Sequence, residues 1–152
     1  MKIEDSFVVA APQARVWSFI TDPEKIGPCI PGCQGIEVTG PNSYKASVRV
    51  EIGPIKADFK LQVDVEEEVP PSHARSVTRG EEGGRASLLT AQNLLKLESV
   101  DGQSTKVTYS SEISLVGRLG KFGFGVMKKK AKSLGDQLAQ ALQERLAADG
   151  GT

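Results

Sequence analysis

The chain has 152 residues, and its 19 lysines and arginines balance 19 aspartates and glutamates, so its formal net charge at pH 7 is zero. This length suits one domain with one sizeable core, and the lack of a basic excess argues against a nucleic-acid binder held by overall charge. No apolar run reaches the roughly 20 residues of a membrane-spanning helix, and the N-terminus does not read as a signal peptide. We therefore expect a cytoplasmic protein, at most peripheral at the inner face of the cell membrane.

The first part of the chain predicts one strand and two short helices. Residues 2–11 (KIEDSFVVAA) carry apolar side chains close to a period of two, which is typical of a strand. Pro12 suits the first turn of a helix, and the stretch that follows it, through Ile20, has apolar residues at helical spacing. Asp22 and Pro23 then fit the cap and the first position of a second, shorter helix.

The middle of the chain predicts about six antiparallel strands joined by short turns. Polar and apolar residues alternate most clearly in SYKASVRVEI and IKADFKLQVDVEEEV, which Gly53 and Pro54 separate as a turn. In each stretch one face is apolar and needs cover. The expected strands are residues 34–40, 43–52, 55–69, 73–81, 85–100 and 105–117.

A long amphipathic helix is expected at the end of the chain. Apolar residues recur at three- and four-residue steps from Leu119 to Leu146, which draws one stripe along a helix. This helix is the only element large enough to cover the apolar face of the sheet. The predicted fold class is therefore α+β, with a curved antiparallel sheet of about seven strands wrapped around the C-terminal helix. Residues 1–148 form the single domain, and residues 149–152 form a disordered end.

Such a sheet encloses more volume than one helix fills, and large apolar hollows are the usual ligand sites. The candidate lining residues are apolar or aromatic and come from the strand faces, the first helix and the segment before the last helix. The alternative is that these residues fill a dry core. They are Trp17, Ile20, Phe59, Leu61, Leu95, Tyr109, Phe122, Phe124, Val126 and Met127.

Residues 117–132 (GRLGKFGFGVMKKKAK) are unusual for the entry to a helix, because glycine costs a helix about 1 kcal/mol relative to alanine. We predict that this segment is a lid whose hinge is Gly117, Gly120, Gly123 and Gly125. The alternative is that the glycines only allow a strand end to pack closely against the helix. The lysines that follow are expected either to contact anionic lipid or a partner protein or to form the solvated face of the helix. They are Lys128, Lys129 and Lys130.

The sequence contains no recognisable catalytic or metal-binding set. It has one histidine, no G-x-S-x-G elbow and no phosphate loop. Tyr109, Ser111 and Asn93 are the polar candidates for an inward position, and none has an adjacent base. Cys29 and Cys33 with a single histidine poorly support zinc, so we interpret them as inert thiols, with a redox role as the alternative. We expect no metal and no tightly bound cofactor.

The order of elements resembles the helix-grip fold of the START/Bet v 1-like (SRPBCC) superfamily. Within it, three stretches resemble the CoxG family of carbon monoxide dehydrogenase proteins, and the likeness spans nearly the whole chain. The three stretches are DPEKIGPCIPGCQGIE at 22–37, VRVEIGPIKADFKLQVDV at 48–65 and GRLGKFGFGVMKKKAK at 117–132.

This resemblance implies a non-enzymatic accessory protein that recruits a molybdenum hydroxylase, typically CO dehydrogenase, to the membrane or couples it to the respiratory chain. Together with an apolar cavity, it suggests a carried isoprenoid quinone such as menaquinone, and no nucleic-acid partner. Two alternatives stay open: a helix-grip enzyme, of the cyclase or hydratase kind, that acts on an apolar substrate, and a dry-core adaptor for enzyme assembly. Many family members carry a C-terminal tail proposed to reach the membrane, and this chain is expected to lack it.

Overall fold

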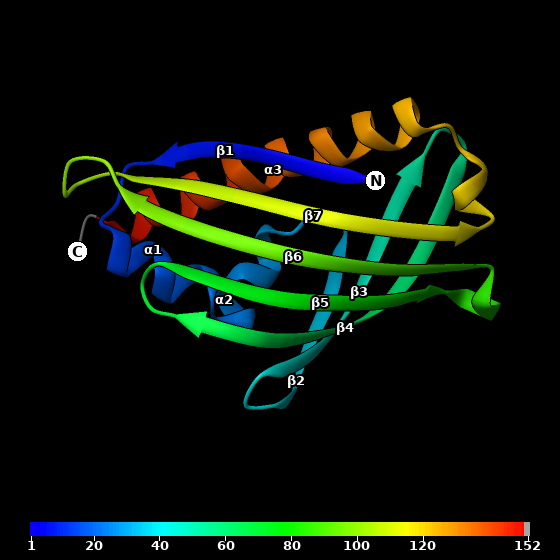
Figure 1. Cartoon of the computed structure of the whole chain (residues 1–152), viewed down its shortest axis with the longest axis horizontal. Coiled ribbons are helices and arrows are strands. Elements are labelled where there is room, and N and C mark those ends of the chain that lie inside the picture. The colour runs from blue at the N-terminus through cyan, green and yellow to red at the C-terminus, as the bar shows by residue number, and fades with distance from the viewer. Residues whose placement is uncertain (151–152) are drawn as a thin grey trace.

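Seven antiparallel strands form one sheet in the order β1-β7-β6-β5-β4-β3-β2 (Figure 1). The computed structural model describes the backbone of residues 1–150, and their side chains apart from Phe124 and residues 148–150. The strands are β1 (Lys2–Val9), β2 (Cys33–Gly40), β3 (Ser43–Ile52), β4 (Ile55–Val69), β5 (His73–Glu82), β6 (Ser87–Ser99) and β7 (Thr105–Gly117). The helices and 3-10 turns are α1 (Gln13–Ile20), α2 (Pro23–Ile26), η1 (Gly27–Cys29), η2 (Gly83–Arg85), η3 (Leu119–Lys121) and α3 (Phe124–Gly150). The predicted class and element order are confirmed.

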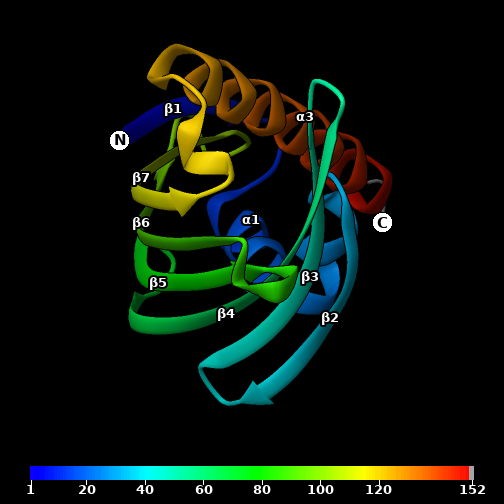
Figure 2. The same cartoon turned by 90° about the vertical axis from the view of Figure 1, so that its right-hand side faces the viewer.

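The sheet curls, and α3 lies across its open side. Seen along the sheet, β4 to β7 form one side of the interior, β2 and β3 form the opposite side, and α3 runs across the top between them (Figure 2). The strand β1 pairs with β7 at the edge beside α3, and α1 and α2 close one end of the interior (Figure 1). Strands of this length can curl this far because they twist and because β2 and β4 contain register shifts.

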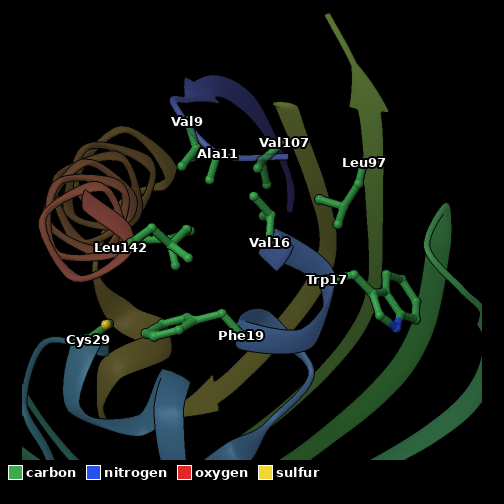
Figure 3. Packing of buried hydrophobic residues seen from close by; sticks show 10 residues of the cluster. Val9, Ala11, Val16, Trp17, Phe19, Cys29, Leu97, Val107 and Leu142 are labelled. Atoms are coloured by element: carbon green, nitrogen blue, oxygen red, sulfur yellow. The ribbon is translucent and has the colours of Figure 1, made fainter. Parts of the chain in front are cut away.

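The buried apolar residues form two clusters rather than one. The first lies at the α1 end, where Val16 of α1 and Leu142 and Leu146 of α3 are at most 1% exposed. Val9, Ala11, Val16, Phe19, Val107 and Leu142 converge there, and Trp17 projects from α1 toward the sheet (Figure 3). The second cluster lies at the η3 end and consists of Ile52, Ala57, Phe59 and Leu119. Each cluster closes one end of the inner face of the sheet.

The prediction that the helical stripe begins at Leu119 is wrong, because α3 starts at Phe124. Leu119 belongs to the separate turn η3, and Phe122 is extended at φ −69° and ψ 143°. The backbone N–H of Leu119 donates to the Ser87 hydroxyl at 3.0 Å, which ties this turn to β6 instead of to the helix. At the other end, α3 continues to Gly150, two residues past the expected domain end, and the expectation for residues 151–152 lies outside the described residues.

The strand β6 was expected from residue 85 and begins at Ser87. Gly84 and Arg85 have positive φ values of 69° and 59°, which take the chain out of extended geometry at the turn between β5 and β6. The other strand boundaries agree with the expected ranges to within two residues.

Candidate ligand-binding site

The inner face of the sheet is the side that carries Leu97 of β6 and Val107 of β7, which pack with Leu142 of α3 in the first cluster. Side chains two residues apart along a strand share a face, so Asn93 and Ser111 lie on this inner face. The register pairs Asn93 with both Ser111 and Ser76 of β5. The middle of the inner face is therefore polar, whereas both ends are apolar.

Hydrogen bonds join these polar side chains into a row. The Asn93 amide donates through Nδ2 to Ser76 Oγ at 3.3 Å and to Thr78 Oγ1 at 3.0 Å. The Ser111 hydroxyl donates to Asn93 Oδ1 at 2.8 Å. All four residues are partly exposed although they face the interior. We call Ser76, Thr78, Asn93 and Ser111 the Asn93 row.

Open space lies beside this row, toward the second cluster. A hollow of about 950 Å³ is bordered by Ala91 and Ile113, which are the inner-face neighbours of Asn93 and Ser111 along β6 and β7. Phe122 and Met127, from the segment between β7 and α3 and the start of α3, also border it. A second hollow of about 900 Å³ is bordered mostly by outward-facing residues, such as Lys60 and Val116, and by a few inner-face residues, such as Leu61. Both hollows are open to the surface, since they also touch outward-facing neighbours. The interior between the two clusters is thus not filled by the helix.

The structure distributes the predicted lining residues over both ends of the interior. In the first cluster Trp17 is 8% exposed, and Ile20 and Leu95 pack against the cluster. In the second cluster Phe59 is 5% exposed, and Leu61, Phe122 and Met127 pack against it. Val126 is 48% exposed and borders neither hollow. The side chain of Phe124 lies outside the described residues, and the ligand-lining role of the whole set stays a prediction.

Tyr109 connects the inner face to the helix. Its ring makes an edge-on contact with Phe7, with ring centres 6.5 Å apart. Its hydroxyl lies against Gly135 of α3, where a side chain would overlap it. Burial raises the pKa of the Tyr109 phenol. The absence of a side chain at Gly135 therefore lets the helix approach the sheet at this point.

A charged group fixes the same helix to the edge strand. Lys132 Nζ lies 2.5 Å from Asp5 Oδ2 of β1 and 2.9 Å from Asp136 Oδ1 of α3. The hydrogen bond from Lys132 lowers the pKa of the Asp5 carboxyl. Lys132 thus faces the sheet edge, while Lys128 and Lys129 are exposed and Lys130 is partly exposed. Whether those three lysines contact a membrane or a partner stays a prediction.

The four glycines of the predicted lid fall into two pairs. Gly117 has φ +97°, and a Cβ there would stand 2.8 Å from the Ser87 Cα; a Cβ at Gly120 would stand 2.7 Å from the Leu115 carbonyl oxygen. These two positions need glycine for close packing. In contrast, a Cβ at Gly123 or Gly125 would meet no atom within 4 Å. Packing accounts for the first pair only.

An ion pair anchors the start of this segment, and sequence reasoning missed it. The carboxylate of Glu82, which is 5% exposed, accepts from the Ser87 hydroxyl at 2.9 Å and pairs with the Arg118 guanidinium. The hydrogen bond from Arg118 lowers the pKa of Glu82. One signal in the sequence could have indicated that Glu82 faces inward. Position 82 falls on the inward-facing side of the alternation along β5. The chain is therefore held to the sheet at Arg118 and Leu119.

Cys29 and Cys33 are both free thiols. Burial raises the pKa of the Cys29 thiol, which disfavours the reactive thiolate. Among the described residues, no group of three histidine, cysteine or acidic side chains could hold a metal ion. In the same part of the chain, no helix is both long and apolar enough to cross a bilayer.

A curved antiparallel sheet around one long C-terminal helix, with open interior space, defines the helix-grip class. The fold is similar to that of a conserved protein from Geobacillus kaustophilus (TM-score 0.90, 24% identity, 97% of this chain and 96% of that chain covered). It is also similar to a START superfamily protein from Mycobacterium smegmatis (TM-score 0.77, 16% identity, 97% of both chains covered). The Zhui aromatase/cyclase from Streptomyces sp. R1128 shares the fold at a TM-score of 0.63, with 12% identity over 98% of this chain and 92% of that one.

The family follows from the sequence itself. The model of the carbon monoxide dehydrogenase CoxG family matches residues 6–147, so the chain belongs to that family. No curated protein sequence matches the chain. The family predicted from the three sequence stretches is thereby confirmed.

Proposed function

We propose that this protein carries an isoprenoid quinone, such as menaquinone, on the inner face of its sheet. In this role it recruits a molybdenum-containing CO dehydrogenase to the inner face of the membrane and couples it to the respiratory chain, without catalysing a reaction itself. The family name supports the link to CO dehydrogenase. The helix-grip fold supports an apolar ligand.

The observation that carries the proposal is the partly exposed inner face between the two clusters. In a dry core, inward-facing side chains would be buried, as Val16 and Leu142 are. Instead Leu95, Ile113 and Leu115 remain partly exposed although they face the interior. The adjoining hollow of about 950 Å³ is at the upper end of the size range of small-molecule sites, about 300–1,000 Å³. Its border combines apolar side chains, such as Phe122 and Met127, with polar and charged ones, such as Glu112. The apolar part of this border is what would contact an isoprenoid quinone.

Quinone binding is tested with the single tryptophan as reporter. Trp17 lies in the first cluster, and a quinone bound nearby quenches its fluorescence. Titration with menaquinone in detergent should give saturable quenching, and native mass spectrometry of the purified protein mixed with a bacterial lipid extract should show a retained quinone. A protein that stays empty in both experiments would refute the quinone proposal.

Coupling is tested separately with the enzyme. Purified CO dehydrogenase, CO and menaquinone vesicles should give CO-dependent quinone reduction that rises with added protein. A rate that is independent of this protein would refute the coupling role and leave quinone binding standing.

A helix-grip enzyme is the second candidate, and the Asn93 row is the observation that favours it. Polar side chains converge on the inner face, and Tyr109 lies next to Ser111 on the same face. Within the described part of the chain no acid or histidine hydrogen-bonds to the row, so a general base would have to come from the substrate or from water. Turnover of an apolar polyketide or hydroxyacyl substrate that disappears on Tyr109→Phe would support this candidate.

A further inference from the structure

The Asn93 row is out of place in the middle of the inner face, because most positions beside it along the strands are apolar. Its neighbours along the strands on one side are Ala91 and Ile113, and on the other side Leu95 and Tyr109. Placing polar groups inside a protein costs free energy unless they are hydrogen-bonded. Leucine or valine at these positions would fill the inner face equally well, so packing alone does not explain the polar side chains of this row.

The donors and acceptors of the row can be counted. Both N–H groups of the Asn93 amide are used, one by Ser76 and one by Thr78, and Asn93 Oδ1 is used by Ser111. Ser76 and Thr78 therefore act as acceptors, which leaves each with its own O–H proton. Within the described residues these two protons have no acceptor, and the Ser111 oxygen has no donor.

The free groups point to a specific ligand chemistry. Two hydroxyl donors two residues apart on β5 suit an oxygen that accepts two hydrogen bonds, as a carbonyl oxygen does. The amide of Asn93 fixes both hydroxyls, because each must present its oxygen to Nδ2 and its proton elsewhere. No charged side chain hydrogen-bonds to the row within the described part of the chain, so the site suits a neutral carbonyl and not a carboxylate.

We propose that the Asn93 row binds a carbonyl oxygen of the carried molecule through the Ser76 and Thr78 hydroxyls. This inference rests on the proposed function, in which the carbonyl is that of a quinone ring. The apolar tail then runs from the row past Ala91 and Ile113 into the hollow bordered by Phe122 and Met127. The row sets which end of the ligand lies in the middle of the sheet.

The test compares two ligands that differ only in the carbonyls. One is menaquinone-1, and the other is 2-methylnaphthalene with the same one-unit isoprenoid tail. Affinities are measured by isothermal titration calorimetry on the full chain. Thr78→Val removes one donor with little change in shape, and Asn93→Leu removes the group that orients both donors. The matched controls are Thr39→Val in β2 and Gln103→Leu in the turn after β6, because both residues are exposed and border neither hollow.

We expect Thr78→Val to weaken menaquinone-1 binding about three- to tenfold, which is the loss of one hydrogen bond. Asn93→Leu should weaken it about tenfold or more. Neither variant should change the affinity for the naphthalene, which also shows that the variants are folded. The two control variants should bind both ligands like the parent protein.

Three other outcomes contradict the proposal in different ways. If the parent protein binds menaquinone-1 and both row variants bind it equally well, the row has no role in recognition, while the proposed function stands. If the row variants lose both ligands to the same degree, the row only supports the sheet, and the inference is overturned. If the parent protein binds the naphthalene but not menaquinone-1, the proposed function fails, and this inference fails with it.

Discussion

The contact between Gly135 and Tyr109 predicts how α3 sits on the sheet. A Cβ at position 135 would stand 3.3 Å from Tyr109 Cζ and would overlap the hydroxyl oxygen. Gly135→Ala must therefore displace either the Tyr109 ring or the helix. The ring is rigid and packs against Phe7, so it yields less readily than a flexible side chain.

The expected change in stability is the sum of two opposing terms. Replacing glycine by alanine within a helix normally stabilises it by about 1 kcal/mol. Forcing an extra methyl group into a filled space costs about 1–3 kcal/mol. We expect the second term to win and Gly135→Ala to lower the free energy of unfolding by about 1 kcal/mol. Tyr109→Phe removes the overlapping oxygen, so it should recover most of this loss in the double variant.

Gly125→Ala is the matched control, because it makes the same change in the same helix with no atom within 4 Å of the added Cβ. It should leave stability unchanged or raise it by about 0.5–1 kcal/mol. The assay is urea unfolding followed by Trp17 fluorescence and by far-ultraviolet circular dichroism. If Gly135→Ala stabilises the protein as Gly125→Ala does, α3 does not approach Tyr109 closely at position 135, and the predicted overlap is wrong.

Three further predictions concern the lid, the ion pair and the core. Gly123→Ala combined with Gly125→Ala should slow menaquinone dissociation in stopped-flow quenching, because it stiffens the segment over the hollow; an unchanged rate would rule out the lid. Because Arg118 lowers the pKa of Glu82 below its ordinary 4.5, their pairing stabilises the fold above that pH and is lost as pH falls through the lowered pKa. Glu82→Gln should cost about 1–2 kcal/mol at pH 7 and flatten the loss of stability below about pH 4.5; an unaltered pH profile would contradict it. Leu142→Ala, at a position 1% exposed, should cost about 2–5 kcal/mol in urea unfolding, and a smaller cost would show that the first cluster is loosely packed.

The fold could be predicted from the sequence where one physical signal dominated. The strict alternation in residues 43–52 and 55–65 predicted the inward and outward faces correctly, because the side-chain period of a strand is two. The start of α3 could not be predicted in the same way. The apolar spacing continues through Leu119 and Phe122, although those residues form a 3-10 turn and an extended residue, so periodicity alone does not mark the boundary.

The candidate site was predicted only in part. Asn93 and Ser111 were identified as inward, but their partners Ser76 and Thr78 were not, because the contact depends on the register of three strands. The turns between β5, β6 and β7 set that register, and it is not visible in the alternation of a single strand. The same limit applies to Glu82, whose partner Arg118 is 36 residues away in sequence.

Both proposals require a quinone to lie on the inner face between the two clusters. The most direct measurement is a set of intermolecular nuclear Overhauser effects between menaquinone-1 and the methyl-labelled protein. Contacts are expected from the ligand to Leu95, Ile113 and Met127, all of which face the interior. Contacts confined to Leu88 and Val116, which are exposed on the outer face, or no contacts at saturating ligand, would contradict it.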